Sequence, residues 1–82
     1  MDVMSHIKQY QRVRVRQLLY PIETYDGWRL NQRLPQVGDI GTVVELLQAA
    51  ELPMKYLVES GGPDGRTIWL SNFDMEEIEP LD

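Results

Sequence analysis

Residues 12–17 read Arg-Val-Arg-Val-Arg-Gln, and this short stretch decides the fold class. Strict alternation of charged and apolar side chains has the period of two that is typical of a strand with one buried face. The sequence therefore predicts a strand here, with Val13 and Val15 facing the core. The solvent-facing side of that strand then carries three arginines, Arg12, Arg14 and Arg16.

A second strand is predicted over about residues 40–47, where a β-branched run follows a turn containing two glycines. One alternative stays open, because residues 43–52 also place apolar side chains at helical spacing behind a possible capping box of Thr42 and Glu45. The β-branched residues favour the strand, and the leucines that follow favour the helix.

The remaining strands form a hairpin and a short C-terminal piece. Residues 55–59 and 67–70 flank the turn cluster Gly-Gly-Pro-Asp-Gly at 61–65, which predicts a hairpin. Ser71 and Asn72 offer capping oxygens for a short turn through 73–75, and residues 77–79 form a last strand before Pro80. Five short strands with almost no helix predict an all-β fold, a small barrel of about five strands with a long first loop.

The composition agrees with one small domain and excludes several kinds of site. The chain has 82 residues, 43% of them apolar, with no cysteine and one histidine, so thiolate chemistry, cysteine-based metal sites and histidine pairs are excluded. That histidine, His6, lies in residues 1–9, which we expect to be a tail or a short helix before the barrel at 10–82. No signal peptide or membrane span is predicted, so we expect a soluble cytoplasmic protein without cofactor or metal.

The charges are divided unevenly along the chain. Residues 1–33 carry six basic and three acidic side chains, whereas residues 34–82 carry two basic and ten acidic ones. The net charge of −5 disfavours nucleic acid at long range, but a local basic face remains possible.

The order of these elements is similar to that of a known group of folds. The strand at 12–15, the long loop, the Gly38-Asp39-Ile40-Gly41-Thr42-Val43 element, the Gly-rich hairpin and the acidic end together resemble SH3-like barrels of small bacterial proteins. The group includes photosystem I subunit IV, the variable chain of ferredoxin–thioredoxin reductase, the nitrile hydratase β-subunit barrel, the nitrogen-fixation accessory protein NifZ and uncharacterised bacterial domains. The resemblance implies a non-catalytic subunit that docks on a larger partner. The Gly-x-x-Gly-Thr-Val element also resembles the KOW motif of ribosomal and transcription proteins.

The segment 20–36 is the main candidate for a binding surface. It combines aromatic side chains with arginine, which are the residue types enriched at interface hot spots and on nucleic-acid stacking surfaces. The alternative is that this segment folds back to cap a thin barrel, with Trp28 and Leu30 as core. A small irregular hairpin across Asp26-Gly27 would shorten the structureless stretch. The candidates are Tyr20, Tyr25, Trp28, Arg29 and Arg33.

Three further features each have two interpretations. Trp69 is either core or an exposed platform, and we favour the platform because its neighbours Ile68 and Leu70 point the other way. The arginine stripe is either a solvated face paired with acids such as Glu45 or Glu59, or a nucleic-acid contact. The turn residues Gly38, Asp39 and Gly41 either permit a backbone conformation or a close strand approach that other residues would hinder, or form an RNA-facing loop.

The sequence thus favours a non-enzymatic accessory module that binds a protein partner, as a monomer or a homodimer. A KOW-like RNA-binding domain is the alternative. A small enzyme is less favoured, because no acid, base and nucleophile set is visible and the pair Glu76-Glu77 has the pattern of a solvated edge.

Overall fold

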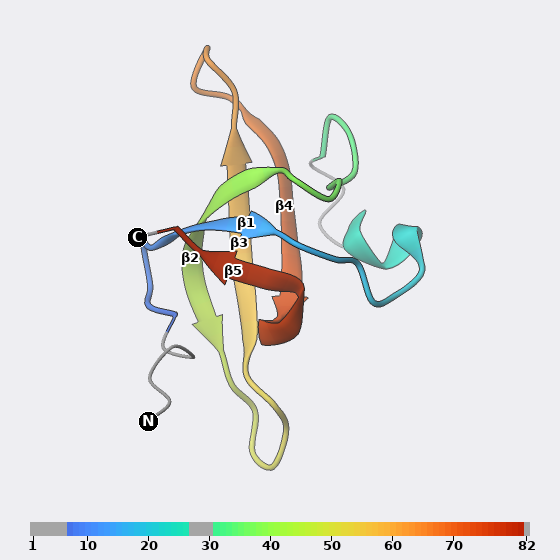
Figure 1. Cartoon of the computed structure of the whole chain (residues 1–82), viewed down its shortest axis with the longest axis vertical. Helices are drawn as coiled ribbons and strands as arrows, with labels where there is room; N and C mark the ends of the chain where they lie inside the picture. Colours follow the sequence, from blue (N-terminus) through green and yellow to red (C-terminus); the bar gives the residue numbers. More distant parts are fainter. Residues whose placement is uncertain (1–6, 27–30, 82) are drawn as a thin grey trace.

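The structure is a computed structural model that describes residues 7–26 and 31–81 and contains one antiparallel sheet of five strands (Figure 1). The sheet order is β4-β3-β2-β1-β5, and β1 and β5 cross β3 and β4 at a steep angle, which gives a barrel-like fold. The predicted all-β fold of about five strands is confirmed. The strands are β1 (Arg12–Val15), β2 (Ile40–Leu47), β3 (Lys55–Gly61), β4 (Thr67–Asp74) and β5 (Ile78–Pro80), and two short 3-10 helices are η2 (Ile22–Asp26) and η3 (Met75–Glu77).

The alternation in β1 follows from its place in the sheet. β1 pairs with β2 on one side and β5 on the other, so that Val13 lies opposite Gly41 and Pro80. Val13 and Val15 are buried, whereas the arginines on the other face of β1 are exposed, as the period of two predicts.

The helical alternative for residues 43–52 is wrong, and a β-bulge explains why the pattern resembled a helix. β2 pairs with β3 through Val43 opposite Val58 and Leu46 opposite Tyr56, with a register shift between Val43 and Glu45. The extra residue of a bulge moves the next inward position from two residues away to three. The inward spacing of Val43 and Leu46 therefore equals that of a helix, although the backbone is a strand.

The predicted hairpin of β3 and β4 is confirmed, but β4 is longer than predicted. It runs to Asp74, so the turn at 73–75 capped by Ser71 and Asn72 is wrong: Ser71 is buried within the strand, and η3 begins only at Met75. The inward row of β4 is formed by alternate residues, Trp69, Ser71 and Phe73.

The exposed platform expected at Trp69 is therefore also wrong, because this side chain is fully buried. Trp69 packs edge-on against Phe73, with 5.6 Å between the ring centroids, and its Nε1–H donates to Asp39 Oδ2 at 2.9 Å. The neighbours Ile68 and Leu70 are half-buried, and Ile68 packs against the core.

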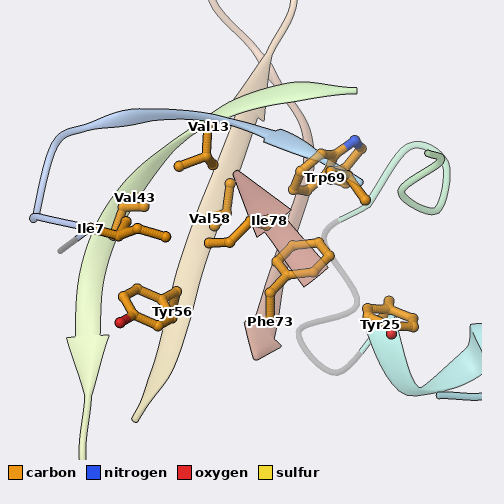
Figure 2. Close-up of a cluster of buried hydrophobic side chains, with 10 residues drawn as sticks. Ile7, Val13, Tyr25, Val43, Tyr56, Val58, Trp69, Phe73 and Ile78 are labelled. Atoms are coloured by element: carbon orange, nitrogen blue, oxygen red, sulfur yellow. The ribbon is translucent and has the colours of Figure 1, made fainter. Parts of the chain in front are cut away.

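The core lies between the β1–β5 pair and the β3–β4 hairpin (Figure 2). Ile7, from the segment expected to be a tail or short helix, joins it with 6% of its surface exposed, while His6 is outside the described residues. Within the described residues no helix has the length and apolar character needed to cross a membrane. The core cluster consists of Ile7, Val13, Val15, Tyr25, Val43, Tyr56, Val58, Trp69, Phe73 and Ile78.

The long first loop covers the outer edge of β4. The Gln32 N–H donates to the Ile68 carbonyl at 2.7 Å, and the Leu70 N–H donates to Asn31 Oδ1 at 2.8 Å. These bonds satisfy backbone groups of an edge strand that would otherwise be open to another chain. In place of the hairpin expected across Asp26-Gly27, residues 22–26 form η2, and Gly27 lies outside the described residues.

Candidate functional site

The first loop is anchored in the barrel by a buried carboxylate. Glu77 is fully buried, and its Oε2 accepts hydrogen bonds from the Leu19 N–H at 3.0 Å and from the Tyr25 hydroxyl. Its Oε1 accepts a third bond from the Asp74 N–H at 2.8 Å. The expectation that Glu76-Glu77 is a solvated edge is therefore wrong for Glu77. These three donors make the burial favourable, and two of them, from Leu19 and Tyr25, are more than 50 positions away in the sequence.

Tyr25 contributes the aromatic half of this anchor. Its ring is 1% exposed and lies 5.5 Å from that of Phe73, so the loop does cap the barrel at this point. Burial, and then the hydrogen bond to Glu77, raise the pKa of Tyr25 to about 12. The Tyr25 hydroxyl also accepts a hydrogen bond from the Tyr20 N–H at 3.2 Å. This bond fixes the position of the Tyr20 backbone beside the core.

Tyr20 extends outward into a small charged cluster with Lys55 and Asp74. The Tyr20 hydroxyl donates to Asp74, which also forms an ion pair with Lys55, its register partner across β3 and β4. The Lys55 ammonium lies 5.1 Å from the centre of the Tyr20 ring, within cation–π range.

The three side chains of this cluster shift one another's pKa. The hydrogen bond to Asp74 raises the pKa of Tyr20 and that of Lys55. Burial alone would raise the pKa of Asp74, but its bonds from Lys55 and Tyr20 outweigh this and lower it. The cluster therefore holds one cation and one anion that neutralise each other.

An open groove of about 810 Å³ lies beside this cluster, between the first loop and the loop that joins β2 to β3. Its lining is mostly apolar, and Leu52 on its rim is 60% exposed. We call it the Tyr20 groove. It is lined by Tyr20, Leu46, Leu47, Gln48, Ala49, Leu52, Pro53, Lys55, Asn72 and Asp74.

The structure separates five of the six partner-binding candidates of the sequence into three groups, and the sixth, Arg33, binds Asp39. Tyr20, 42% exposed, lies at the groove. Tyr25 and Trp69 are buried, so neither can contact a partner, and the interpretation of both as surface residues is corrected. Trp28 and Arg29 lie outside the described residues, as does Leu30, the other core residue of the capping alternative. The groove residues that the sequence did not predict come from β2, β3, β4 and the loop that joins β2 to β3. The exposed pair Leu52-Pro53 in that loop is the one signal that could have pointed to them.

Arg33 and the turn that leads into β2 form a structural network around Asp39. Asp39 accepts bonds from Arg33 at 2.7 and 3.2 Å, from the Gln36 N–H at 3.0 Å and from Trp69. Burial tends to raise the pKa of Asp39, but these hydrogen bonds lower it overall. The network holds the Asp39 side chain against the barrel rather than toward a ligand.

The two glycines expected in this turn have different roles, and Gly41 lies within β2 and not in the turn. Gly38 adopts a φ of 98°, which L-residues rarely take. Gly41 packs so closely on β3 that a Cβ atom there would lie 2.7 Å from Val58 Cγ1. Both roles concern the backbone.

The arginine stripe is exposed, and one of its members has an acidic partner other than those expected. Arg14 forms its ion pair with Glu79 of β5 at 3.3 Å, not with Glu45 or Glu59. The register places Glu79 directly opposite Arg14.

Across residues 7–26 and 31–81, no group of three or more histidine, cysteine, aspartate or glutamate side chains is placed to hold a metal ion. Comparison with known proteins gives no match to any family model, to any curated protein or to any solved structure.

Proposed function

We propose that this chain is a non-enzymatic interaction module that docks on a larger protein partner through the Tyr20 groove. The observation that carries the proposal is the groove itself, an apolar hollow with an ordered tyrosine on one wall and exposed leucine on the other. Tyrosine is among the residues that dominate binding energy at interfaces, since it brings a large contact area with few rotatable bonds.

The charged groups of the groove support recognition more than catalysis. A general acid or base needs a free proton-transfer group within reach of a substrate. Lys55 and Asp74 are instead bound to each other and to Tyr20, so they orient the ring and leave the groove close to neutral. A neutral apolar groove suits an apolar segment of a protein partner. A reducing compartment such as the cytoplasm suits a chain without cysteine.

Partner capture with matched surface variants tests this proposal. Leu52 and Val37 are 60% and 61% exposed, but only Leu52 lines the groove. We expect Leu52→Ser and Tyr20→Ala to weaken capture of a partner from lysate by roughly 30-fold, the ratio for a hot spot of about 2 kcal/mol. Val37→Ser is the control and should capture normally.

Two checks distinguish a loss of docking from unfolding of the variants and from capture through nucleic acid. The melting temperatures of all three variants should stay close to that of the parent chain, because the substituted side chains are exposed. Nuclease treatment of the lysate should leave the captured protein in place. Equal capture by the Leu52 and Val37 variants would refute the groove as the docking surface.

A further inference from the structure

A second surface, distinct from the Tyr20 groove, runs along β1 and the turn before it. Its exposed basic and aromatic side chains are Lys8 and Tyr10, which lie in the turn at 8–11 beside the exposed Gln9, and the alternate residues Arg12, Arg14 and Arg16. None of them lines the Tyr20 groove. We call this surface the β1 outer face, and it consists of Lys8, Tyr10, Arg12, Arg14 and Arg16.

Tyr10 has an unusual conformation for an aromatic residue. Its backbone φ is 71°, in the left-handed region that favours glycine and asparagine, and its side chain is 71% exposed. Its N–H donates to the Val43 carbonyl, so pairing with β2 holds this backbone in place. A bulky ring in this conformation gains little packing in return for its strain, and strained, exposed residues of this kind concentrate at binding sites.

Among the described residues, few acidic side chains lie beside the arginines of this face, and those that do are Glu79 and, in a small hollow that Arg16 also lines, Glu76. On β2 the residues opposite Arg12 and Arg14 are Thr42 and Ile40, and both are uncharged. On β5 the residue opposite Arg14 is Glu79, and the side chains of this ion pair are 45% and 42% exposed at a separation of 3.3 Å. An exposed pair of this kind is weak, so Arg14 can exchange Glu79 for another anion.

We propose that the β1 outer face binds single-stranded nucleic acid. The arginines contact successive phosphates along the extended strand, and the Tyr10 ring stacks on a base. An acidic polypeptide would satisfy the arginines equally well, but it would leave the exposed ring of Tyr10 without a role. Nucleic-acid binding is a function separate from the docking of a protein partner. The acidic remainder of the chain repels phosphate and so confines the nucleic acid to the β1 outer face.

Fluorescence anisotropy with a labelled oligouridylate tests the proposal on the whole chain. We expect binding at low salt with a slope of log affinity against log salt of about −2, from three phosphate contacts on a single strand. Arg12→Gln should reduce that slope by about 0.7. Arg66→Gln is the matched control, since Arg66 is exposed in the β3–β4 turn, away from β1, and should change neither slope nor affinity.

The stacking contact is tested by Tyr10→Asn, which keeps a residue suited to the left-handed backbone and so preserves the fold. It should weaken binding about five-fold or more while leaving the salt slope unchanged. Three results would overturn the proposal: no binding at low salt, equal effects of the Arg12 and Arg66 variants, or displacement of the oligonucleotide by polyglutamate with Tyr10→Asn neutral. The last result would assign the face to an acidic protein.

Discussion

Replacing Tyr25 by phenylalanine removes one oxygen atom from the centre of the contact between the first loop and the barrel. The ring keeps its packing against Phe73, so no cavity term arises. What is lost is the hydrogen bond to the buried carboxylate of Glu77, which then has only the N–H groups of Leu19 and Asp74 as donors. The Tyr20 N–H loses its acceptor in the same substitution.

The expected loss of stability follows from the charge and the burial of Glu77. A hydrogen bond to a charged group contributes about 1.5–3 kcal/mol, and a buried carboxylate cannot replace the missing donor with bulk water. We therefore expect Tyr25→Phe to lower the free energy of unfolding by roughly 2 kcal/mol. In a domain of this size that corresponds to a fall of about 10–15 °C in the melting temperature.

Thermal unfolding followed by circular dichroism measures this effect, and Tyr20→Phe is its matched control. Tyr20 also donates its hydroxyl to a carboxylate, that of Asp74, but it does so at the surface, where water can take the place of the lost oxygen. The melting temperature of the Tyr20→Phe variant should stay near that of the parent chain. If the two variants unfold at the same temperature, the buried Tyr25–Glu77 contact does not anchor the loop and the reasoning fails.

Three further predictions concern pH and close packing. The pKa of Tyr25 is raised from 10.0 to about 12 in the folded chain, so the stability that Tyr25 contributes is complete below pH 10 and is lost as the pH rises toward 12. Urea unfolding at increasing pH should show this loss. The Tyr25→Phe variant should not show it. The pKa of Asp39 is lowered from 3.8 in the folded chain, so the stability that Asp39 contributes is present above that pH and is lost as the pH falls below it. The Asp39→Asn variant should be less stable at neutral pH, and its stability should fall less in acid. Gly41→Ala, whose Cβ would lie 2.7 Å from Val58 Cγ1 and 2.8 Å from the Glu59 carbonyl oxygen, should cost about 1–3 kcal/mol in urea unfolding, whereas Leu52→Ala on the rim of the groove should cost far less.

The strands were predictable because their patterns are local. Val13 and Val15 alternate with arginines over neighbouring positions, and the turn at 61–65 contains residues that favour a reversal whatever surrounds them. Neighbouring residues alone are therefore enough to predict these elements. The bulge in β2 made the same kind of reasoning ambiguous, since one extra residue converts the spacing of a strand into that of a helix.

The candidate site was less predictable because its side chains meet only in the folded chain. Glu77 is separated from Tyr25 by 52 positions and Tyr20 from Asp74 by 54, so no window of sequence places them together. Trp69 was misassigned for a related reason. Its aliphatic neighbours looked like the core row of β4, but the barrel needs the large rings of Trp69 and Phe73 to fill its interior.

The first loop consequently has two roles that depend on each other. Tyr25 joins the core, and Asn31 covers the edge of β4. Tyr20 supplies a wall of the groove. These roles meet in one hydrogen bond, from the Tyr20 N–H to the Tyr25 hydroxyl. A groove held in this way is already ordered before binding, so less conformational entropy is lost on binding. Loosening the anchor with Tyr25→Phe should therefore weaken partner binding even though Tyr25 touches no partner.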